Sequence, residues 1–291
     1  MYAQFFGSFL VQQHAVTPDQ LADAIARLGQ ARIKLGTMAM HKGYMDAGRV
    51  DEVCMEQTRQ DKRFGEIAVE MGYLTQEQVS DLLQSQTPDY LLLGQNLVDT
   101  NALTNADLER FLASYQQKAQ ITDLNVENED QIRNLVKSFF LLAERPVDDA
   151  ALMYMTLLFN DLVRFIGSDF TPLPPSAAQE IPVHHCLSQV VTGPVRLISR
   201  IEMEEDAAIR FASRFAKMEF DGMSEYITAA AADFLNLHNG LFSVNMSNEY
   251  GRELNLEPPV EAKVQSLALD GSTCLLPVQY PFGTVNFILS L

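Results

Sequence analysis

The chain has 291 residues, of which 47% are hydrophobic and 20% are charged, and its net charge at pH 7 is −17. A chain this acidic repels a phosphate backbone, so the charge argues against nucleic acid and anionic membrane surfaces as partners. The length favours two domains, and the hydrophobic content lets each bury a core of its own.

Three further features predict a cytoplasmic protein without membrane insertion. No segment approaches the roughly 18 uninterrupted apolar residues that a membrane helix needs. The start of the chain lacks the basic region of a signal peptide. The three cysteines, Cys54, Cys186 and Cys274, are scattered and suggest no disulfide framework.

A glycine that recurs every 29 residues marks four copies of a repeat in the first part of the chain. The glycines each follow a large apolar residue, and they are Gly7, Gly36, Gly65 and Gly94. Seven residues later stands a position that we expect to end a short helix in the left-handed conformation, occupied by His14, Gly43, Gly72 and Asn101. Three residues further stands an N-cap for a second helix, namely Thr17, Asp46, Thr75 and Thr104.

The second helix of each copy carries apolar residues at offsets of four, seven and eight from its cap, which makes a single stripe. A helix pair with one apolar stripe cannot bury it alone, so neighbouring copies must pack together. The sequence therefore predicts an all-α domain of four helical repeats over residues 1–118, with copies 1 and 4 as its structural ends.

The two middle copies, which begin Lys34-Leu35-Gly36 and Arg63-Phe64-Gly65, resemble the N-terminal domain of type II secretion and type IV pilus assembly ATPases in its MshEN form. Some members of that family bind cyclic di-GMP. The resemblance would place ligand contacts at Lys34, Gly36, Gln57, Arg63, Gly65 and Gln86.

A guanidinium can bind phosphate or stack on guanine, and glycine allows close backbone approach, so this chemistry is consistent with a nucleotide. Copies 1 and 4 have Phe5 and Leu92 in place of the basic residue. The alternative interpretation is that the glycines are structural and that Lys34 and Arg63 are solvated surface charges.

Residues 119–147 are predicted to be a linker with a connecting helix, and residues 148–291 a second domain. Pro146 separates two helical stretches at 130–144 and 148–167, and Asp148 or Asp149 can cap the second. Beyond an extended run at 170–175, the pattern alternates between strands and helices. We expect two strands within 183–201, joined by a turn at Gly193-Pro194. Two helices follow at 204–218 and 223–239, and Gly240 is expected to end the second. The remaining strands are predicted at 241–247, 260–268, 273–279 and 283–291. The predicted fold class is α+β, an antiparallel-rich sheet with packed helices.

One motif gives the second domain a family resemblance. The run Asp233-Phe-Leu-Asn236 is followed by 22 residues and then Pro259, and residues 282–287 read FGTVNF. This resembles the CheC/CheX/FliY group of chemotaxis phosphatases, although that group usually has Glu where this chain has Asp233, and Asp or Ser at Ala229. The resemblance implies a CheX-like fold, a phosphorylated response-regulator receiver as partner, hydrolysis of its phospho-aspartate, and members that can pair as homodimers.

Asp233 and Asn236 stand three residues apart, so they project from one helix face. Hydrolysis of an aspartyl phosphate needs a water held in line with phosphorus, and a carboxamide can hold that water without titrating. We therefore predict Asn236 to position the water and Asp233 to pair with a receiver lysine. This chain then needs no cofactor or metal of its own, because the receiver supplies Mg²⁺.

Other interpretations of these residues stay open. Asp233 and Asn236 can be two polar residues on a solvated helix face. His238-Asn239 can orient Asn236 or simply cap the helix, and His184-His185-Cys186 make a poor metal site, since adjacent strand residues point to opposite faces. The alternative function is a non-enzymatic signalling adaptor, with a degenerate CheX-like domain and repeats that bind cyclic di-GMP.

Overall fold

The computed structural model describes residues 2–30, 32–85, 89–118, 129–144, 147–175, 179–269 and 273–290. The chain forms two compact units: residues 9–125 make up the repeat unit, and residues 3–8 together with 126–291 make up the sheet unit. Helix α1 (Tyr2–Gln12) thus supplies residues to both units. Within the described ranges, no helix is long and apolar enough to cross a membrane.

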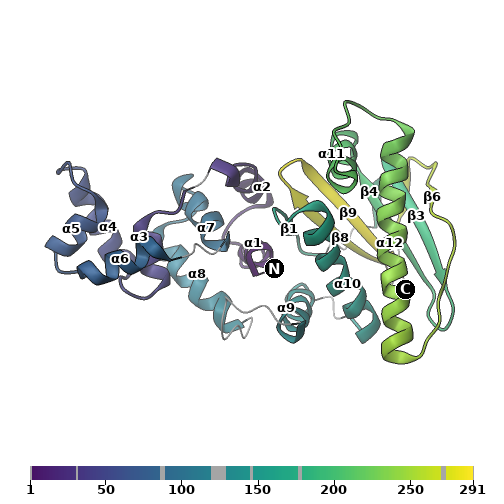
Figure 1. Ribbon diagram of the computed structural model, residues 1–291, viewed down its shortest axis with the longest axis horizontal. Helices are drawn as coiled ribbons and strands as arrows, with labels where there is room; N and C mark the ends of the chain where they lie inside the picture. The colour runs from purple at the N-terminus through teal and green to yellow at the C-terminus, as the bar shows by residue number, and fades with distance from the viewer. Residues whose placement is uncertain are drawn as a thin grey trace. The chain divides into compact units, whose positions relative to one another are not determined.

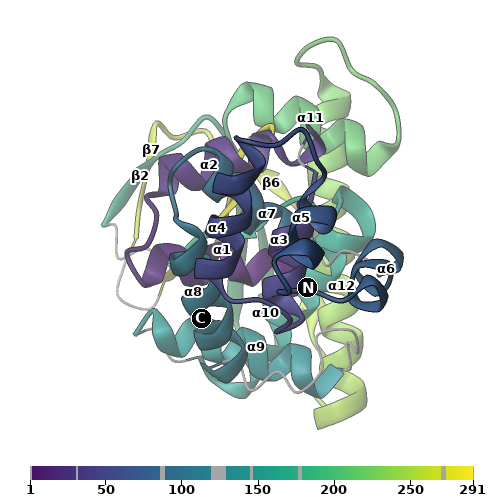
Figure 2. The same ribbon diagram turned by 90° about the vertical axis from the view of Figure 1, so that its left-hand side faces the viewer.

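The repeat unit consists of the predicted helix pairs (Figures 1 and 2). After α1 they are α2 (Pro18–Ala26), α3 (Leu35–His41), α4 (Ala47–Gln57), α5 (Phe64–Glu70), α6 (Gln76–Gln84), α7 (Asp89–Asp99) and α8 (Asn105–Lys118). The expected N-caps are confirmed, because the side chains of Thr17, Asp46, Thr75 and Thr104 each accept a bond from the backbone N–H three residues on. The left-handed positions are confirmed too, with φ of 55° at His14, 69° at Gly43, 74° at Gly72 and 58° at Asn101.

The repeated glycine is required by the crossing of the two helices within a copy. A Cβ on Gly36 would lie 2.8 Å from Val50 Cγ1, and one on Gly94 would lie 2.5 Å from Leu108 Cδ1. In both copies the crowding side chain stands 14 residues after the glycine. The same spacing holds in copy 3, where Gly65 faces Val79 at 3.1 Å. The structure therefore gives the glycines a packing role that is independent of any ligand.

Copies 2 and 3 also cover each other's glycines. The ring of Phe64 would lie 3.1 Å from a Cβ on Gly36, and Leu35 Cδ2 would lie 3.2 Å from one on Gly65. The large residue before each glycine thus packs on the glycine of the other copy, which explains why that position is apolar.

The order of the repeats predicts copies 1 and 4 as the two ends of the domain, but in the structure these copies contact each other. The rings of Phe9 and Phe111 meet edge to face at 6.4 Å, and Asn96 Nδ2 donates to Ala24 O at 2.7 Å. First and last copies therefore pack on each other, because the apolar stripe of each needs a partner and the array is short enough to bring them together.

The sheet unit has the predicted α+β architecture. Its main sheet is antiparallel with strand order β1-β8-β9-β4-β3-β5, and β6 also pairs with β3. The strands are β1 (Thr171–Pro172), β3 (His185–Thr192), β4 (Leu197–Met203), β5 (Asn255–Leu256), β6 (Val260–Glu261), β8 (Thr273–Tyr280) and β9 (Gly283–Ser290). The helices are α9 (Glu129–Leu142), α10 (Asp149–Asp161), α11 (Glu205–Ala216) and α12 (Glu225–Tyr250), with a π-helical turn at Leu162–Ile166 after α10.

Helices and a short ribbon cover opposite faces of this sheet. Helix α12 packs on β3 and β4, and α11 packs on β9 (Figure 1). The ring of Phe234, on α12, lies against the rings of Phe211 and Phe287. On the other face, β2 (Glu180–Pro182) and β7 (Ser266–Ala268) lie side by side (Figure 2) and form an antiparallel ribbon. Ile181 of that ribbon packs on Leu275 and Ile288.

The predicted end of the second helix at Gly240 and the predicted strand at 241–247 are wrong. Helix α12 continues through Gly240 to Tyr250, and Gly251 closes it with φ of 63°. A glycine inside a helix costs only about 1 kcal/mol. Phe242 and Met246 are fully buried and extend the apolar stripe of α12, so packing outweighs that cost.

Candidate functional site

The predicted motif lies on the exposed face of α12. Asp233 and Asn236 are both exposed, as is Ala229 one turn earlier, while Phe234 and Leu235 between them are buried. The apolar residues hold the helix against the sheet, and this fixes the direction of the two polar side chains. Asp233 is exposed and has no hydrogen-bond or ion-pair partner among the residues that the structure describes.

The Asn236 carboxamide is held by a buried residue that lies outside the predicted motif. Gln189, in the middle of β3, donates from Nε2 to Asn236 Oδ1 at 2.8 Å. The same nitrogen donates to the backbone oxygen of Glu257, also at 2.8 Å. Glu257 precedes Pro258 and Pro259, in the segment that pairs with β3 through β5 and β6. Gln189 therefore brings together the helix motif and the proline segment that the sequence had linked only by spacing.

A second layer of buried groups supports Gln189. Asn239 Nδ2 donates to Gln189 Oε1 and to Ser199 Oγ, both at 2.7 Å. The hydroxyl of Tyr154, on α10, donates to Asn239 Oδ1 at 3.0 Å. Burial raises the pKa of Tyr154 well above its usual value, so the hydroxyl keeps its proton and remains a donor.

Of the pair His238-Asn239, only Asn239 is linked to Asn236, and the link runs through Gln189. His238 is buried and points elsewhere, with Nδ1 at 2.8 Å from Asp161 Oδ2. Because α12 continues past both residues, neither of them caps it.

Gln189 left a signal in the sequence that could have been found. Residues on alternate positions of a strand share one face, and Leu187, Gln189 and Val191 form such a set. A glutamine between two aliphatic residues on the face toward the helices must hydrogen-bond inside the core, because an unpaired buried amide is costly.

The residues predicted to contact a nucleotide are only partly brought together. Lys34, Gly36 and Gln57 line a cavity of about 330 Å³ in the repeat unit. Arg63 and Gly65 are not among its lining residues, and Gln86 lies outside the described residues. Lys34 Nζ is 2.5 Å from Asp99 Oδ1, so its charge is already partly neutralised.

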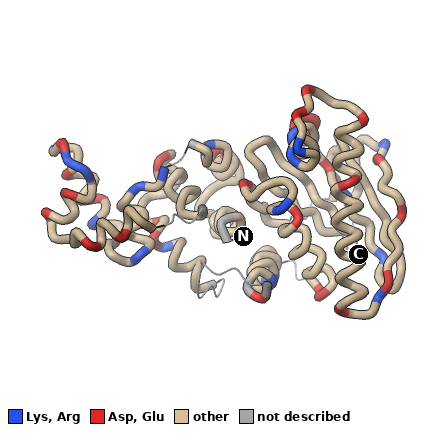
Figure 3. Tube along the Cα trace, in the orientation of Figure 1, with Lys and Arg blue, Asp and Glu red and all other residues tan. Residues whose placement is uncertain are grey.

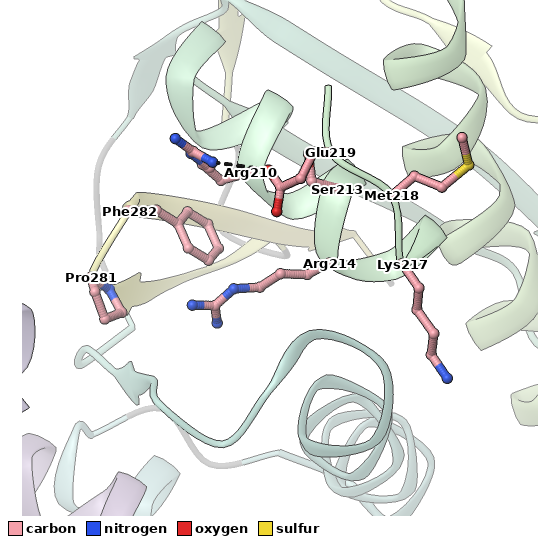
Figure 4. A pocket seen from close by; sticks show the side chains of 8 residues that line it. All are labelled: Arg210, Ser213, Arg214, Lys217, Met218, Glu219, Pro281 and Phe282. Atoms are coloured by element: carbon pink, nitrogen blue, oxygen red, sulfur yellow. Dashed lines mark hydrogen bonds and ion pairs between the residues drawn. The ribbon is translucent and has the colours of Figure 1, made fainter. Parts of the chain in front are cut away.

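A basic pocket in the sheet unit offers a second place for a ligand. Lysine and arginine gather on and just after α11 (Figure 3), and Arg210, Arg214, Lys217 and Phe282 line a cavity of about 510 Å³. Figure 4 shows that these cations do not converge: Arg210 and Lys217 point to opposite sides, and Arg214 extends beneath Phe282.

Two of these three cations already have carboxylate partners. Arg214 makes a bidentate ion pair with Asp169 at 2.5 and 2.8 Å, and this ion pair raises its pKa. Arg210 lies 3.3 Å from Glu219. We therefore assign no ligand to this pocket.

In the described part of the chain, no three His, Cys, Asp or Glu residues are grouped so that they could hold a metal ion. His184 of the His-His-Cys run binds Glu202 instead, with Nδ1 at 3.1 Å from Oε1.

Comparison with known proteins found similarity only at the level of solved structures. No protein-family model and no curated protein matches the chain. A CheC-like superfamily protein from Shewanella sp. PV-4 is 17% identical, with a TM-score of 0.43, over 49% of this chain and 97% of that one. The chemotaxis protein CheX from Desulfovibrio desulfuricans is 14% identical, with a TM-score of 0.42, over 50% of this chain and 99% of that one. A CheX–CheY–BeF₃–Mg²⁺ complex from Borrelia burgdorferi contains a chain that is 16% identical, with a TM-score of 0.41, over 49% of this chain and 97% of that one.

Proposed function

We propose that the sheet unit hydrolyses the phospho-aspartate of a response-regulator receiver in a chemotaxis or motility pathway. The observation that carries this proposal is the pair of exposed polar side chains on α12, in which Asn236 is held by Gln189 beside the proline segment and Asp233 has no partner among the described residues. The Asp-x-x-Asn motif with its spaced proline resembles the chemotaxis phosphatases, and the contacts of Gln189 with both Asn236 and Glu257 support a single site.

The proposed reaction asks little of this chain beyond positioning. Water attacks phosphorus, the bond from phosphorus to the aspartyl oxygen breaks, and phosphate and the free carboxylate leave. The transition state is loose, so an oriented water and stabilised phosphoryl oxygens supply most of the effect. Mg²⁺ held by the receiver would neutralise charge on the phosphoryl group.

The Asn236 carboxamide can both accept a hydrogen bond from the water and donate one to the phosphoryl group. One lone pair of Oδ1 is taken by Gln189, and the other can accept a hydrogen bond from the attacking water. The Nδ2 group can donate to a phosphoryl oxygen. Asp233, one turn away, would pair with a receiver lysine and set the docking geometry, a surface interaction worth about 0.2–1 kcal/mol.

The test is the rate of phosphate release from a phosphorylated receiver mixed with the full chain. We expect Asn236→Ala to lower kcat by about 100-fold, since misplacing a reacting water has effects of that size. Asp233→Ala should chiefly raise KM, by no more than about fivefold. Asn248→Ala, an exposed asparagine on the same helix, is the matched control and should behave as the wild type. Equal rates for Asn236→Ala and wild type would refute the assignment.

A second proposal concerns the repeat unit, which on this account binds cyclic di-GMP and makes the chain a signalling adaptor. Its support is the cavity that joins Lys34, Gly36 and Gln57. Calorimetric titration of the full chain with the nucleotide should give a saturable heat that Lys34→Ala and Gln57→Ala weaken. Arg27→Ala is the control, because Arg27 is an exposed arginine of the same unit that does not line the cavity and is not a predicted ligand contact. An absence of heat at high micromolar protein would rule the proposal out.

A further inference from the structure

Gln189 is a buried polar residue on an otherwise aliphatic strand face. Its side chain is 0% exposed, and its neighbours on the same strand face, Leu187 and Val191, are aliphatic. The side chain nevertheless makes three hydrogen bonds, two from Nε2 and one to Oε1. These bonds join β3 to α12 and to the segment before Pro258.

The partners of Gln189 fix which way its amide points. The backbone oxygen of Glu257 can only accept a hydrogen bond, so the atom that faces it must be the nitrogen of the Gln189 amide. Asn239 Nδ2, which also donates to Ser199 Oγ, occupies Gln189 Oε1. The orientation of Gln189 therefore follows from its neighbours and does not depend on a choice between two similar atoms.

The orientation of Asn236 follows in turn. Because Gln189 presents a donor, it can hold only the oxygen of the Asn236 carboxamide. The Asn236 nitrogen then points away from the core, and within the described part of the chain it has no hydrogen-bond partner. An exposed asparagine is otherwise free to rotate about χ2, with either end outward.

We propose that Gln189 is a positioning residue: it holds the Asn236 carboxamide with its nitrogen toward the phosphorylated partner and its second oxygen lone pair toward the attacking water. This inference rests on the proposed function. Gln189 does not touch the partner, since it is fully buried, and it acts only through Asn236. The same nitrogen holds Glu257 O, so the proline segment and the catalytic carboxamide keep one spacing.

The sharpest variant is Gln189→Glu, which keeps the shape of the side chain and its acceptor for Asn239 but leaves at most one donor. Burial favours the protonated acid, and its single proton goes to Glu257 O, which can only accept. The new side chain then presents an oxygen acceptor to Asn236 whether it is protonated or ionised, so the carboxamide should turn over. We expect kcat for the phosphorylated receiver to fall about 10- to 100-fold, with KM changed less than about twofold. In the Asn236→Ala background the same change should have no further effect on kcat, because a positioning residue has nothing left to position.

Ser213→Ala is the control. It removes two hydrogen bonds of a buried side chain elsewhere in the sheet unit, one to Ile209 O and one from Phe220 N–H, and leaves all contacts of Gln189 in place, so kcat should stay at the wild-type value. If Ser213→Ala lowers kcat as much as Gln189→Glu, damage to the core explains both and the inference fails.

A spectroscopic measurement tests the contact itself in case the variant folds poorly. In the labelled wild-type chain, both side-chain amide protons of Gln189 should exchange slowly with solvent, because each is buried and bonded. Asn236→Ala should shift one of them and speed its exchange, while Asn248→Ala should leave both unchanged. Fast exchange of both protons in the wild type would overturn the inference.

The outcomes separate the inference from the function on which it rests. If the wild type does not release phosphate from any receiver, the proposed function and the positioning role both fall. If the wild type is active and Asn236→Ala is not, but Gln189→Glu keeps the wild-type kcat, only the role of Gln189 is wrong.

Discussion

The two units of this chain are stabilised by different kinds of contact, local ones that recur in each copy and a single buried polar network. In the repeat unit the same short-range requirements recur: a glycine crowded by the side chain 14 residues later, a left-handed residue and an N-cap. In the sheet unit a single network gathers buried polar groups from distant elements, including Tyr154, Gln189, Ser199 and Asn239. Repeated constraints each carry a modest share of stability, whereas a network in a low-dielectric core loses several bonds when one member is removed.

The largest expected effect is therefore on the network. Asn239→Ala would leave Gln189 Oε1, Ser199 Oγ and Tyr154 OH without their buried partner, and should lower the free energy of unfolding of the sheet unit by about 3 kcal/mol. Hydrogen exchange of the β3 amides in urea would measure this loss. Asn248→Ala should stay within about 0.5 kcal/mol. Equal losses for the two variants would show that the network carries no special share of stability.

The next effect compares a glycine of each unit and should have opposite signs. Gly36→Ala should destabilise the repeat unit by about 1–3 kcal/mol, because the added Cβ meets Val50 and Phe64. Gly240→Ala should stabilise the sheet unit by about 0.5–1 kcal/mol, since no atom lies within 4 Å and alanine favours a helix. Urea unfolding of both variants measures the difference. A stabilising Gly36→Ala would contradict the packing role of the repeated glycine.

A smaller difference is expected between the helix caps of the two units. Thr75 caps α6 and forms a capping box with Gln78, so Thr75→Ala should cost about 1 kcal/mol. Ser224 precedes α12 but makes no side-chain cap bond, and Ser224→Ala should therefore change stability by only a few tenths of a kcal/mol. Hydrogen exchange in the first turn of each helix reports both values. A larger loss at Ser224 would reverse the comparison.

The smallest effect is a pH dependence in the repeat unit. Burial, and secondly the charge of Lys42, lower the pKa of His41 below 6.5. The unfolded chain then binds more protons than the folded one, so stability that is present above pH 6.5 is lost as the pH falls below it. The plot of unfolding free energy between pH 7.5 and 5.5 should be flatter for His41→Gln than for the wild type. Identical slopes would exclude a role for His41.

This contrast also explains what could be predicted from the sequence. The helix pairs, their caps and their left-handed positions follow from local chemistry that is repeated four times, so chance agreement is small. The packing of copy 1 on copy 4 could not be predicted, because Phe9 and Phe111 are joined only by tertiary folding.

In the sheet unit, Asp233 and Asn236 were found because helical spacing places them on one face. The length of α12 was missed because Gly240 resembles a helix end, while burial of Phe242 and Met246 decides otherwise. Gln189 was missed because its partners come from residues 47 to 68 positions away.

The central claim is that the Asn236 carboxamide, on the exposed face of α12, speeds hydrolysis of a receiver's aspartyl phosphate. Its most direct test is single-turnover decay of a phosphorylated receiver in an excess of the full chain. The account predicts faster decay with the wild type than with the receiver alone, and an acceleration about 100-fold smaller with Asn236→Ala. Decay that is equally fast with the wild type and with Asn236→Ala, or no faster than that of the receiver alone, would contradict it.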